Sequence, residues 1–163
     1  MNNIYSFLNT NNINYERFDH PGVFTCEQAR ELCPTMPGAS IKNLFLYDKR
    51  TEQHFLVVVS EDKRVDLKEL KKILDVANLS FASEERLYKY LGVKPGSVTI
   101  LGLVNDIIQA VTVIFDADLK DQALQCHPLI NTATLVIPFE DIKKFLNATK
   151  HEYQFLNIPE RLE

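Results

Sequence analysis

A lysine at the start of an apolar run is the first residue of this chain whose type and position suit chemistry. Lys42 is followed by Asn43 and by the apolar stretch Leu44–Leu46, a composition typical of a buried strand. Side chains alternate along a strand, so Lys42 shares a face with Leu44 and Leu46. Its ammonium therefore either reaches solvent at the end of the strand or lies in a pocket, where it would serve an anion or a carbonyl oxygen. The pattern alone favours the first alternative.

Two polar loops offer further candidates. The turn Gly96-Ser97-Val98-Thr99 begins with a glycine, which lets backbone N–H groups approach a ligand, although an ordinary turn is the commoner outcome. The segment Cys126–Thr134 gathers an imidazole, an amide and two hydroxyls ahead of a predicted strand. Adjacent side chains of an extended segment point to opposite sides, which argues against a Cys–His nucleophile pair at positions 126 and 127. A structural role is the commoner one for such a histidine, and the polar candidates in this segment are His127, Asn131, Thr132 and Thr134.

The net charge of the chain restricts the kinds of polyanion that it can bind. Eighteen Lys and Arg against 22 Asp and Glu give a net charge of −4 and a pI near 5.6, so no global positive field draws the protein to DNA or to an anionic membrane. Lys68, Lys71 and Lys72 share one predicted helix and are the best candidates for contacting phosphates of an RNA partner, although such lysines are usually only solvated.

The chain of 163 residues predicts one domain, and several classes of function lack their signatures. There is no phosphate loop, dinucleotide fingerprint, zincin motif or nucleophile elbow. Cys26, Cys33 and Cys126 form neither a C-x-x-C pair nor a Cys/His cluster, which predicts no metal and suits a reducing compartment. No apolar run is long enough to cross a bilayer, and the N-terminus lacks the pattern of a signal peptide. We expect a cytoplasmic protein without a cofactor.

Periodicity places these residues on an α+β domain with a mixed, largely antiparallel central sheet flanked by helices. The runs 41–47 and 54–59 predict a hairpin, and the runs 97–103 and 107–115 predict a second antiparallel pair. Further strands are expected at 15–18 and 133–137. Helices are expected near the N-terminus, from Thr25 toward Pro34, from Asp66, over 83–91 and 118–124, and over 139–146 after Pro138.

Four ordered segments carry a family resemblance: PGASIKNLFLYDKR, FLVVVSEDKRVDLKEL, LSFASEERLYKYLGVKPGSVTILGLVND and HPLINTATLVI. Together they resemble the YbaK/prolyl-tRNA-synthetase-associated editing family, and most closely its freestanding alanyl-tRNA(Pro) deacylases of the ProX or ProXp-ala type. The resemblance extends over residues 20 to 155. It implies hydrolysis of the ester that joins alanine to the terminal adenosine of tRNA(Pro), with prolyl-tRNA synthetase as a candidate partner.

The resemblance also implies roles for particular residues. Lys42 matches the characteristic lysine of the family, Asn43 the asparagine after it, His127 the histidine of H-P-L-x-N-T-A-T, and Gly96 the glycine of the G-x-x-x-P loop. Ile100 stands where the proline of that loop is usual. The implied catalytic set is Lys42, Asn43, Gly96 and His127, and the implied substrate-binding set is Ser97, Val98, Thr99, Asn131, Thr132 and Thr134.

An activated ester needs a positioned water and a stabilised oxyanion rather than a protein nucleophile. We therefore expect Lys42 to neutralise the terminal phosphate or the carbonyl oxygen, and the Gly96 loop to supply N–H donors. Asn43 and His127 would orient the substrate, the ribose hydroxyl would help to guide the water, and a methyl-sized pocket would exclude proline. The alternatives are a non-catalytic binder of aminoacyl-tRNA or an amino-acid-like ligand, and the same hydrolase acting on another species such as Cys-tRNA(Pro).

Overall fold

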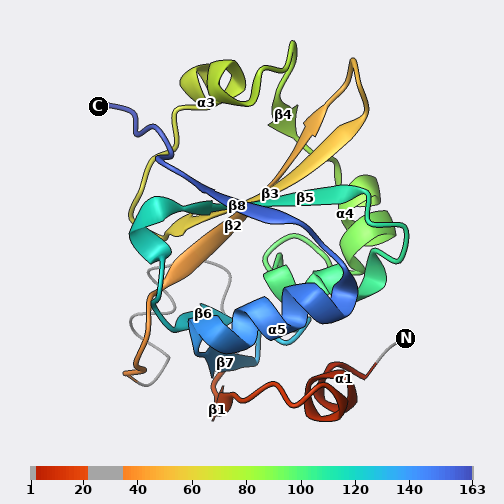
Figure 1. The fold of residues 1–163 in the computed structure, drawn as a ribbon, viewed down its shortest axis with the longest axis vertical. Coiled ribbons are helices and arrows are strands. Elements are labelled where there is room, and N and C mark those ends of the chain that lie inside the picture. Colours follow the sequence, from red (N-terminus) through yellow and green to blue (C-terminus); the bar gives the residue numbers. More distant parts are fainter. Residues whose placement is uncertain (1–2, 22–34, 163) are drawn as a thin grey trace.

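Two β-sheets organise the protein, whose computed structural model describes residues 3–21 and 35–162 (Figure 1). The larger sheet has the order β4 (Ser80–Phe81), β2 (Ile41–Asp48), β3 (Gln53–Ser60), β5 (Val111–Asp116) and β8 (Tyr153–Leu156). β2 pairs antiparallel with β3 and β4, whereas β5 pairs parallel with β3 and β8. The smaller, antiparallel sheet has the order β1 (Glu16–Asp19), β7 (Ala133–Ile137) and β6 (Leu124–Cys126). The α+β class predicted from the sequence is confirmed.

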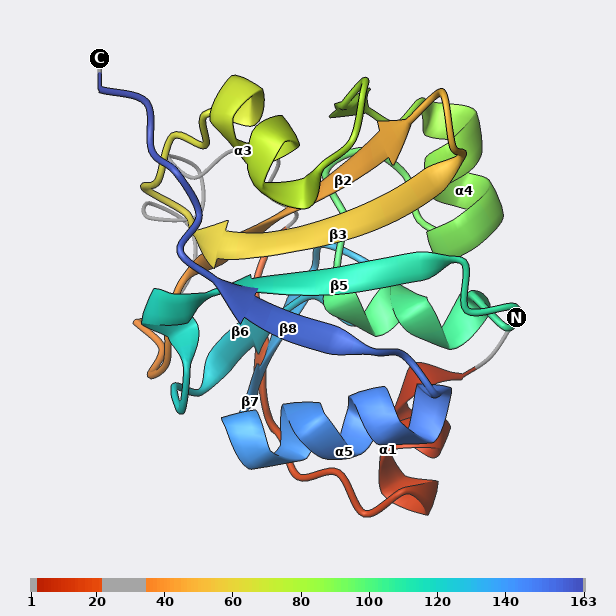
Figure 2. The ribbon, with the colours of Figure 1, turned by 45° about the horizontal axis from the view of Figure 1, so that its top comes forward.

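Both faces of the larger sheet are covered, as Figure 2 shows. Helix α3 (Leu67–Leu74) lies on one face, where its Leu70 packs with Phe55 and Val57 of β3 in a smaller apolar core. The opposite face carries α1 (Ile4–Thr10), α4 (Glu84–Leu91), α5 (Phe139–Thr149) and the smaller sheet. There, Leu56 and Val58 of β3 join the larger core. The all-apolar run of β3 is therefore explained by burial on both sides.

Local capping signals set the ends of the helices that the sequence predicts. The Asp66 side chain accepts a hydrogen bond from the N–H of Glu69 at 3.1 Å and begins α3. Ser83 does the same for Arg86 at 3.2 Å and begins α4. Gly92 ends α4 in the left-handed conformation, with φ of +67°. The predicted hairpin, both of these helices and the strand after the His127 loop are confirmed.

The predicted antiparallel pair at 97–103 and 107–115 is wrong. Ile100–Asn105 forms a 3-10 helix, η1, and β5 pairs parallel with β3 and β8 instead. Ile100 and Leu101 are fully buried, and an apolar run buried on all sides has no period that separates strand from helix. The Thr99 hydroxyl accepts from the N–H of Leu101 at 3.2 Å, which caps η1. Ile100 is thus the first helical residue, a position that tolerates the family's usual proline.

Two other expectations concern helices. The helix predicted over 118–124 is only a 3-10 turn, η2 (Ala117–Leu119), and β6 begins at Leu124, because the end of that segment is drawn into the smaller sheet by β7. The helix expected from Thr25, together with Cys26 and Cys33, lies outside the described residues. Across 3–21 and 35–162, no helix is long and apolar enough to cross a membrane.

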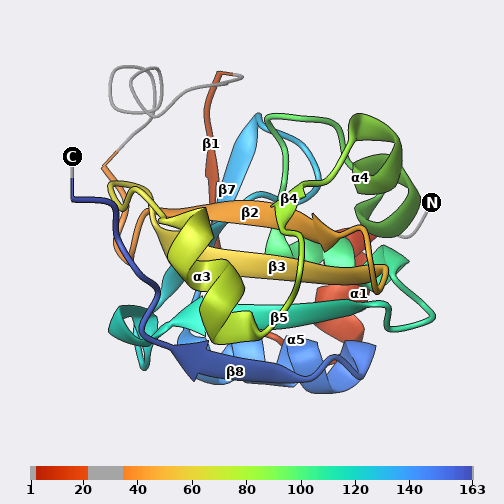
Figure 3. The same ribbon diagram turned by 90° about the horizontal axis from the view of Figure 1, so that it is seen from above.

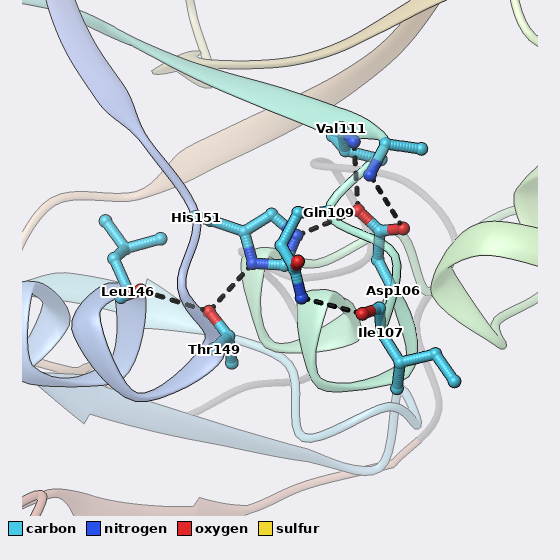
Figure 4. A network of polar contacts seen from close by, with 8 residues as sticks. Asp106, Ile107, Gln109, Val111, Leu146, Thr149 and His151 are labelled. Atoms are coloured by element: carbon cyan, nitrogen blue, oxygen red, sulfur yellow. Dashed lines mark hydrogen bonds and ion pairs between the residues drawn. The ribbon is translucent and has the colours of Figure 1, made fainter.

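A buried carboxylate fastens the end of η1 to the end of α5 (Figure 4). Asp106 accepts hydrogen bonds from the N–H groups of Ala110 and Val111 at 3.1 and 2.9 Å, and from Nε2 of His151 at 2.8 Å. Nδ1 of His151 contacts the Thr149 hydroxyl at 2.8 Å. Burial raises the pKa of Asp106, but the hydrogen bonds from His151 and from the two amides outweigh it and leave this pKa below its ordinary value. This buried network has a structural role, because it holds the end of η1 against the start of β5 and against the segment after α5.

Candidate active site

The start of β2 lies beside β6, and this contact positions the first candidates. Ala39 donates its N–H to the carbonyl of Ala123 at 2.8 Å and accepts from the N–H of Gln125 at 3.1 Å, which forms a parallel bridge between Ala39 and Leu124. Lys42 and His127 each follow this bridge by three residues, on two segments that leave it in the same direction. The fold thus brings two of the implied catalytic positions, far apart in the sequence, to one edge of the larger sheet.

Lys42 and Asn43 face opposite sides of β2. Asn43 alternates with Ile41 and Phe45, which belong to the larger core, whereas Lys42 shares a face with Leu44 on the side of the smaller core. Within the described residues the Lys42 ammonium forms no hydrogen bond or ion pair. Of the described strands, β4 pairs with β2 only at Leu46 and Tyr47, so none covers the β2 edge beside Lys42. Among the described residues, the half-buried Lys42 therefore lies beside an unpaired stretch of the β2 edge.

Asn43 carries an unusual polar atom. Its side-chain carbonyl oxygen, Oδ1, is buried and has no hydrogen-bond partner among the described residues. Leaving a buried acceptor unpaired costs about 1–3 kcal/mol. Asn43 Oδ1 is therefore an acceptor that is ready for a donor supplied from outside the described chain.

His127 is a half-buried, neutral imidazole. Its Nδ1 lies 3.4 Å from the carbonyl oxygen of Ala133, and because a carbonyl can only accept, Nδ1 carries the proton. Nε2 is then an acceptor, and no group of the described chain engages it. Burial lowers the pKa of His127, the proximity of His20 lowers it further, and the bond to Ala133 only partly offsets these effects. His127 can thus accept a hydrogen bond at neutral pH but adds no positive charge.

His20 is a residue of this site that reasoning from the sequence missed. Its N–H donates to the carbonyl of Thr132 at 3.0 Å, and its Nδ1 donates to the carbonyl of Pro21 at 2.9 Å. Nε2 therefore accepts from the Thr134 hydroxyl at 2.8 Å. In the sequence His20 only precedes a Pro-Gly turn, and it is the pairing of β1 with β7 that places it against the His127 loop. His20 holds both ends of Thr132–Thr134.

The other polar candidates in and after the loop between β6 and β7 differ in accessibility. Asn131 is half-buried and Thr132 is exposed. Thr134 is only 4% exposed, and its hydroxyl is used by His20. Leu129 has a φ of +72°, a conformation that leucine rarely adopts, and the packed loop holds it there.

The Gly96 loop is a tight turn with two unused amides. The Ser97 N–H donates to the carbonyl of Lys94 at 3.0 Å, and Gly96 has a φ of +90°, as a turn with Pro95 before it requires. No hydrogen bond among the described residues engages the N–H groups of Gly96 and Val98. Thr99 is fully buried as the cap of η1. The donors of this loop that no described residue uses are therefore the amides on either side of Ser97.

The structure places the helix lysines on the sheet face opposite the His127 loop. Lys68, Lys71 and Lys72 belong to α3, which covers the face of the larger sheet opposite the smaller sheet (Figure 3). Lys72 forms an ion pair with Glu69 at 3.1 Å, whereas Lys68 and Lys71 line a cavity. Any phosphate contact that they make is remote from His127.

The described residues offer neither a reactive thiol nor a metal-binding cluster. Cys126 is buried, and burial raises the pKa of its thiol to about 12, so the thiol is protonated and a poor nucleophile. Among residues 3–21 and 35–162, no cluster of three or more His, Cys, Asp or Glu side chains is arranged to hold a metal ion.

The chain is similar in sequence to several known proteins. Residues 20–145 match the family described as "Aminoacyl-tRNA editing domain". The chain is 37% identical over 147 residues to the "Prolyl-tRNA editing protein ProX" of Acetoanaerobium sticklandii, covering 90% of each protein. It is 38% identical over 148 residues to the "Prolyl-tRNA synthetase associated domain-containing protein 1" of Danio rerio, covering 89% of this chain and 80% of that protein.

A solved structure shares the fold. It belongs to a "putative trans-editing enzyme for prolyl tRNA synthetase", and it aligns with a TM-score of 0.70 over 98% of this chain and 96% of its own, at 17% sequence identity.

Proposed function

Because the chain belongs to the aminoacyl-tRNA editing domain family, we propose that it is a deacylase that hydrolyses the aminoacyl ester of mischarged tRNA(Pro), with alanine as the amino acid removed. The family match supports the reaction class, and the 37% identical relative named as a prolyl-tRNA editing protein supports the tRNA. The observation in the site that carries the proposal is the buried, unpaired Oδ1 of Asn43. A substrate donor, such as the α-ammonium of alanine or a ribose hydroxyl, would satisfy it.

The reaction needs no protein nucleophile. Water adds to the carbonyl carbon, the bond from that carbon to the ribose oxygen breaks, and the ribose oxygen leaves with a proton as alanine is released. The principal cost is the negative charge that develops on the carbonyl oxygen. In our proposal the amides of Gly96 and Val98 face that oxygen, and Lys42 reaches over the uncovered edge of β2 to neutralise it or the terminal phosphate.

His127 acts as a neutral hydrogen-bond acceptor that orients the water or the substrate. With its proton on Nδ1, its Nε2 accepts a hydrogen bond from the attacking water or from the ribose hydroxyl that guides the water. His20 is a positioning residue, because it fixes the two threonines that follow His127 in the same loop. Discrimination against the cognate proline is steric, since a pocket that fits one methyl group rejects a ring.

The test measures deacylation of Ala-tRNA(Pro), Cys-tRNA(Pro) and Pro-tRNA(Pro) by the wild type and by Lys42→Ala and Asn43→Ala. We expect the wild type to prefer the alanyl ester. Lys42→Ala should lose about 100-fold in kcat/KM, the usual cost of removing one group that stabilises an oxyanion. Asn43→Ala removes an acceptor for a substrate donor and should lose about 10-fold or more, the cost of one hydrogen bond to a charged group. Lys143→Ala is the matched control, since it removes a half-buried lysine of α5 whose described contacts are an ion pair with Glu140 and the ring of Phe139, both within α5.

Three outcomes would count against the proposal. Undiminished hydrolysis by Lys42→Ala would remove that lysine from the mechanism. Faster release of cysteine than of alanine would change the substrate. Tight binding of aminoacyl-tRNA by the wild type without turnover would favour a non-catalytic binder.

A further inference from the structure

A cavity lies on the α3 side of the larger sheet, opposite the His127 loop. It has a volume of about 330 Å³, at the small end of the range for ligand cavities. Lys68 and Lys71 of α3, Lys49 of the β2–β3 turn, and Asn78 and Ser80 at the start of β4 line it, and we call it the lysine cavity. Three segments that are separate in the sequence thus meet at one hollow.

The lysine cavity is strongly cationic. Its lining contains three lysines and no carboxylate, and none of the three ammonium groups forms an ion pair with a described residue. Lys72, one residue beyond Lys71, is different because its ammonium is neutralised by Glu69. Three unpaired ammonium groups around one hollow repel one another, and a bound anion would relieve that repulsion.

Buried Asp48 fixes the wall of the cavity. Its carboxylate accepts from the N–H groups of Arg50 and Asn78 at 3.1 and 3.3 Å and from the Thr51 hydroxyl at 2.7 Å. These bonds tie the turn that bears Lys49 to the segment that bears Asn78. The hydrogen bond from Thr51 most of all, then those from the amides, hold the pKa of Asp48 below its ordinary value despite desolvation. Its negative charge cancels part of the lysine charge but leaves the cavity net positive.

The lining fits a phosphate rather than a base. Lysine ammonium groups, the Asn78 amide and the Ser80 hydroxyl are hydrogen-bond donors, which suit phosphate oxygens. The apolar part of the lining is aliphatic, Leu67 and Leu79, and no aromatic side chain is present on which a base could stack.

We propose that the lysine cavity is a subsite for the sugar-phosphate backbone of the tRNA. This inference rests on the proposed function. Lys42 is the second residue of β2, and Lys49 follows directly after its last residue, Asp48, so that roughly 20 Å of strand separates the two lysines. The cavity therefore contacts the body of the acceptor stem and not the terminal adenosine. It contributes to affinity and leaves the chemical step unchanged.

The experiment compares two charge-neutralised proteins. Lys68→Gln/Lys71→Gln removes two lining charges, and Lys72→Gln is the matched control on the same helix, outside the cavity. Binding of uncharged tRNA(Pro) is measured by fluorescence anisotropy between 50 and 200 mM salt. We expect the double variant to raise Kd about tenfold and to reduce the slope of log K against log salt by roughly 0.9 for each phosphate that the protein no longer neutralises. The control should match the wild type, and kcat for Ala-tRNA(Pro) should not change.

Four other outcomes would decide between the subsite, the proposed function and simpler explanations. Equal weakening by Lys72→Gln and by the double variant would show only diffuse attraction and would overturn the subsite. Wild-type affinity and salt slope in the double variant, with normal deacylation, would overturn the subsite but not the proposed function. Lysine-dependent binding of inorganic phosphate, without any effect on tRNA, would identify a free-anion site instead. Loss of tRNA affinity in a protein that cleaves no aminoacyl-tRNA would support the subsite and overturn the proposed function.

Discussion

His54 shows how one buried side chain couples the protein to pH. It is 2% exposed and stacks among Tyr90, Tyr47 and Phe45, with ring centroids 4.2, 5.0 and 5.7 Å away. Its Nε2 lies 3.2 Å from Nη1 of Arg86, and because a guanidinium can only donate, Nε2 accepts and Nδ1 carries the proton. Nδ1 is itself buried without a partner among the described residues. Burial lowers the pKa of His54, and the charge of Arg86 lowers it further.

The lowered pKa of His54 predicts a loss of stability in mild acid. Below the ordinary histidine pKa of 6.5, His54 is protonated in the unfolded chain but remains neutral in the folded protein. The contribution of neutral, buried His54 to the unfolding free energy is therefore fully present above pH 6.5. It is lost as the pH falls from 6.5 toward the pKa of His54 in the folded protein. Each proton of difference contributes up to about 1.4 kcal/mol per pH unit. His54→Phe keeps the ring packing and should flatten the decline in unfolding free energy between pH 7 and pH 5, measured by urea titration.

His127 also has a lowered pKa, so the decline should shrink in His54→Phe without vanishing. An equally steep decline in the variant would show that His54 does not carry this pH dependence.

At the scale of an element, the end of α5 is strained. Lys150 ends this helix in the left-handed conformation, with φ of +63°, and its N–H donates to the carbonyls of Asn147 and Leu146. A left-handed residue with a Cβ costs about 1–2 kcal/mol, whereas glycine has no such penalty.

Lys150→Gly should therefore stabilise the protein. After the extra entropy of glycine in the unfolded chain is subtracted, the expected gain in unfolding free energy is about 0.5–1 kcal/mol. Lys143→Gly is the matched control, because it lies inside α5 and should cost about 1 kcal/mol. Thermal and urea unfolding measure both, and destabilisation by Lys150→Gly would contradict the strain argument.

At the scale of the whole molecule, the C-terminal segment is clipped to the loop before α3, as Figure 2 shows. Lys63 donates to the carbonyl of Ile158 at 2.9 Å and forms an ion pair with Asp116 at 2.6 Å. Backbone bonds from Arg161 to Arg64 and from Asp66 to Pro159 add to the contact. Lys63 is 15% exposed and Asp116 only 2%, so the pair is largely desolvated. It joins β5, the α3 loop and the chain end.

Removal of one partner should cost far more than removal of both. Lys63→Met leaves Asp116 buried without its counter-charge, and we expect a loss of about 3–5 kcal/mol in unfolding free energy. In Lys63→Met/Asp116→Leu, apolar packing replaces the pair and most of the loss should be recovered. A double-mutant cycle by urea unfolding measures the coupling. Additive losses in the double variant would show that the two charges act independently.

The sequence by itself determined the features that depend on neighbouring residues. The caps at Asp66 and Ser83, the β2–β3 hairpin and the α+β class follow from local propensity and alternation, and the ordered motifs indicated the editing family. These signals survive because a cap or a hairpin is decided within a few residues along the chain.

Only the tertiary structure decided the features that depend on distant contacts. The apolar run at 100–105 became η1 because it is buried on all sides, and β5 joined β3 and β8 in parallel across long separations in sequence. His20 reaches Thr134, and Lys49 meets Lys68 at the lysine cavity, through strand and loop pairings that no local pattern contains. The physical reason is that burial and pairing partners are set by chain segments far away in the sequence, whose contacts override local preference.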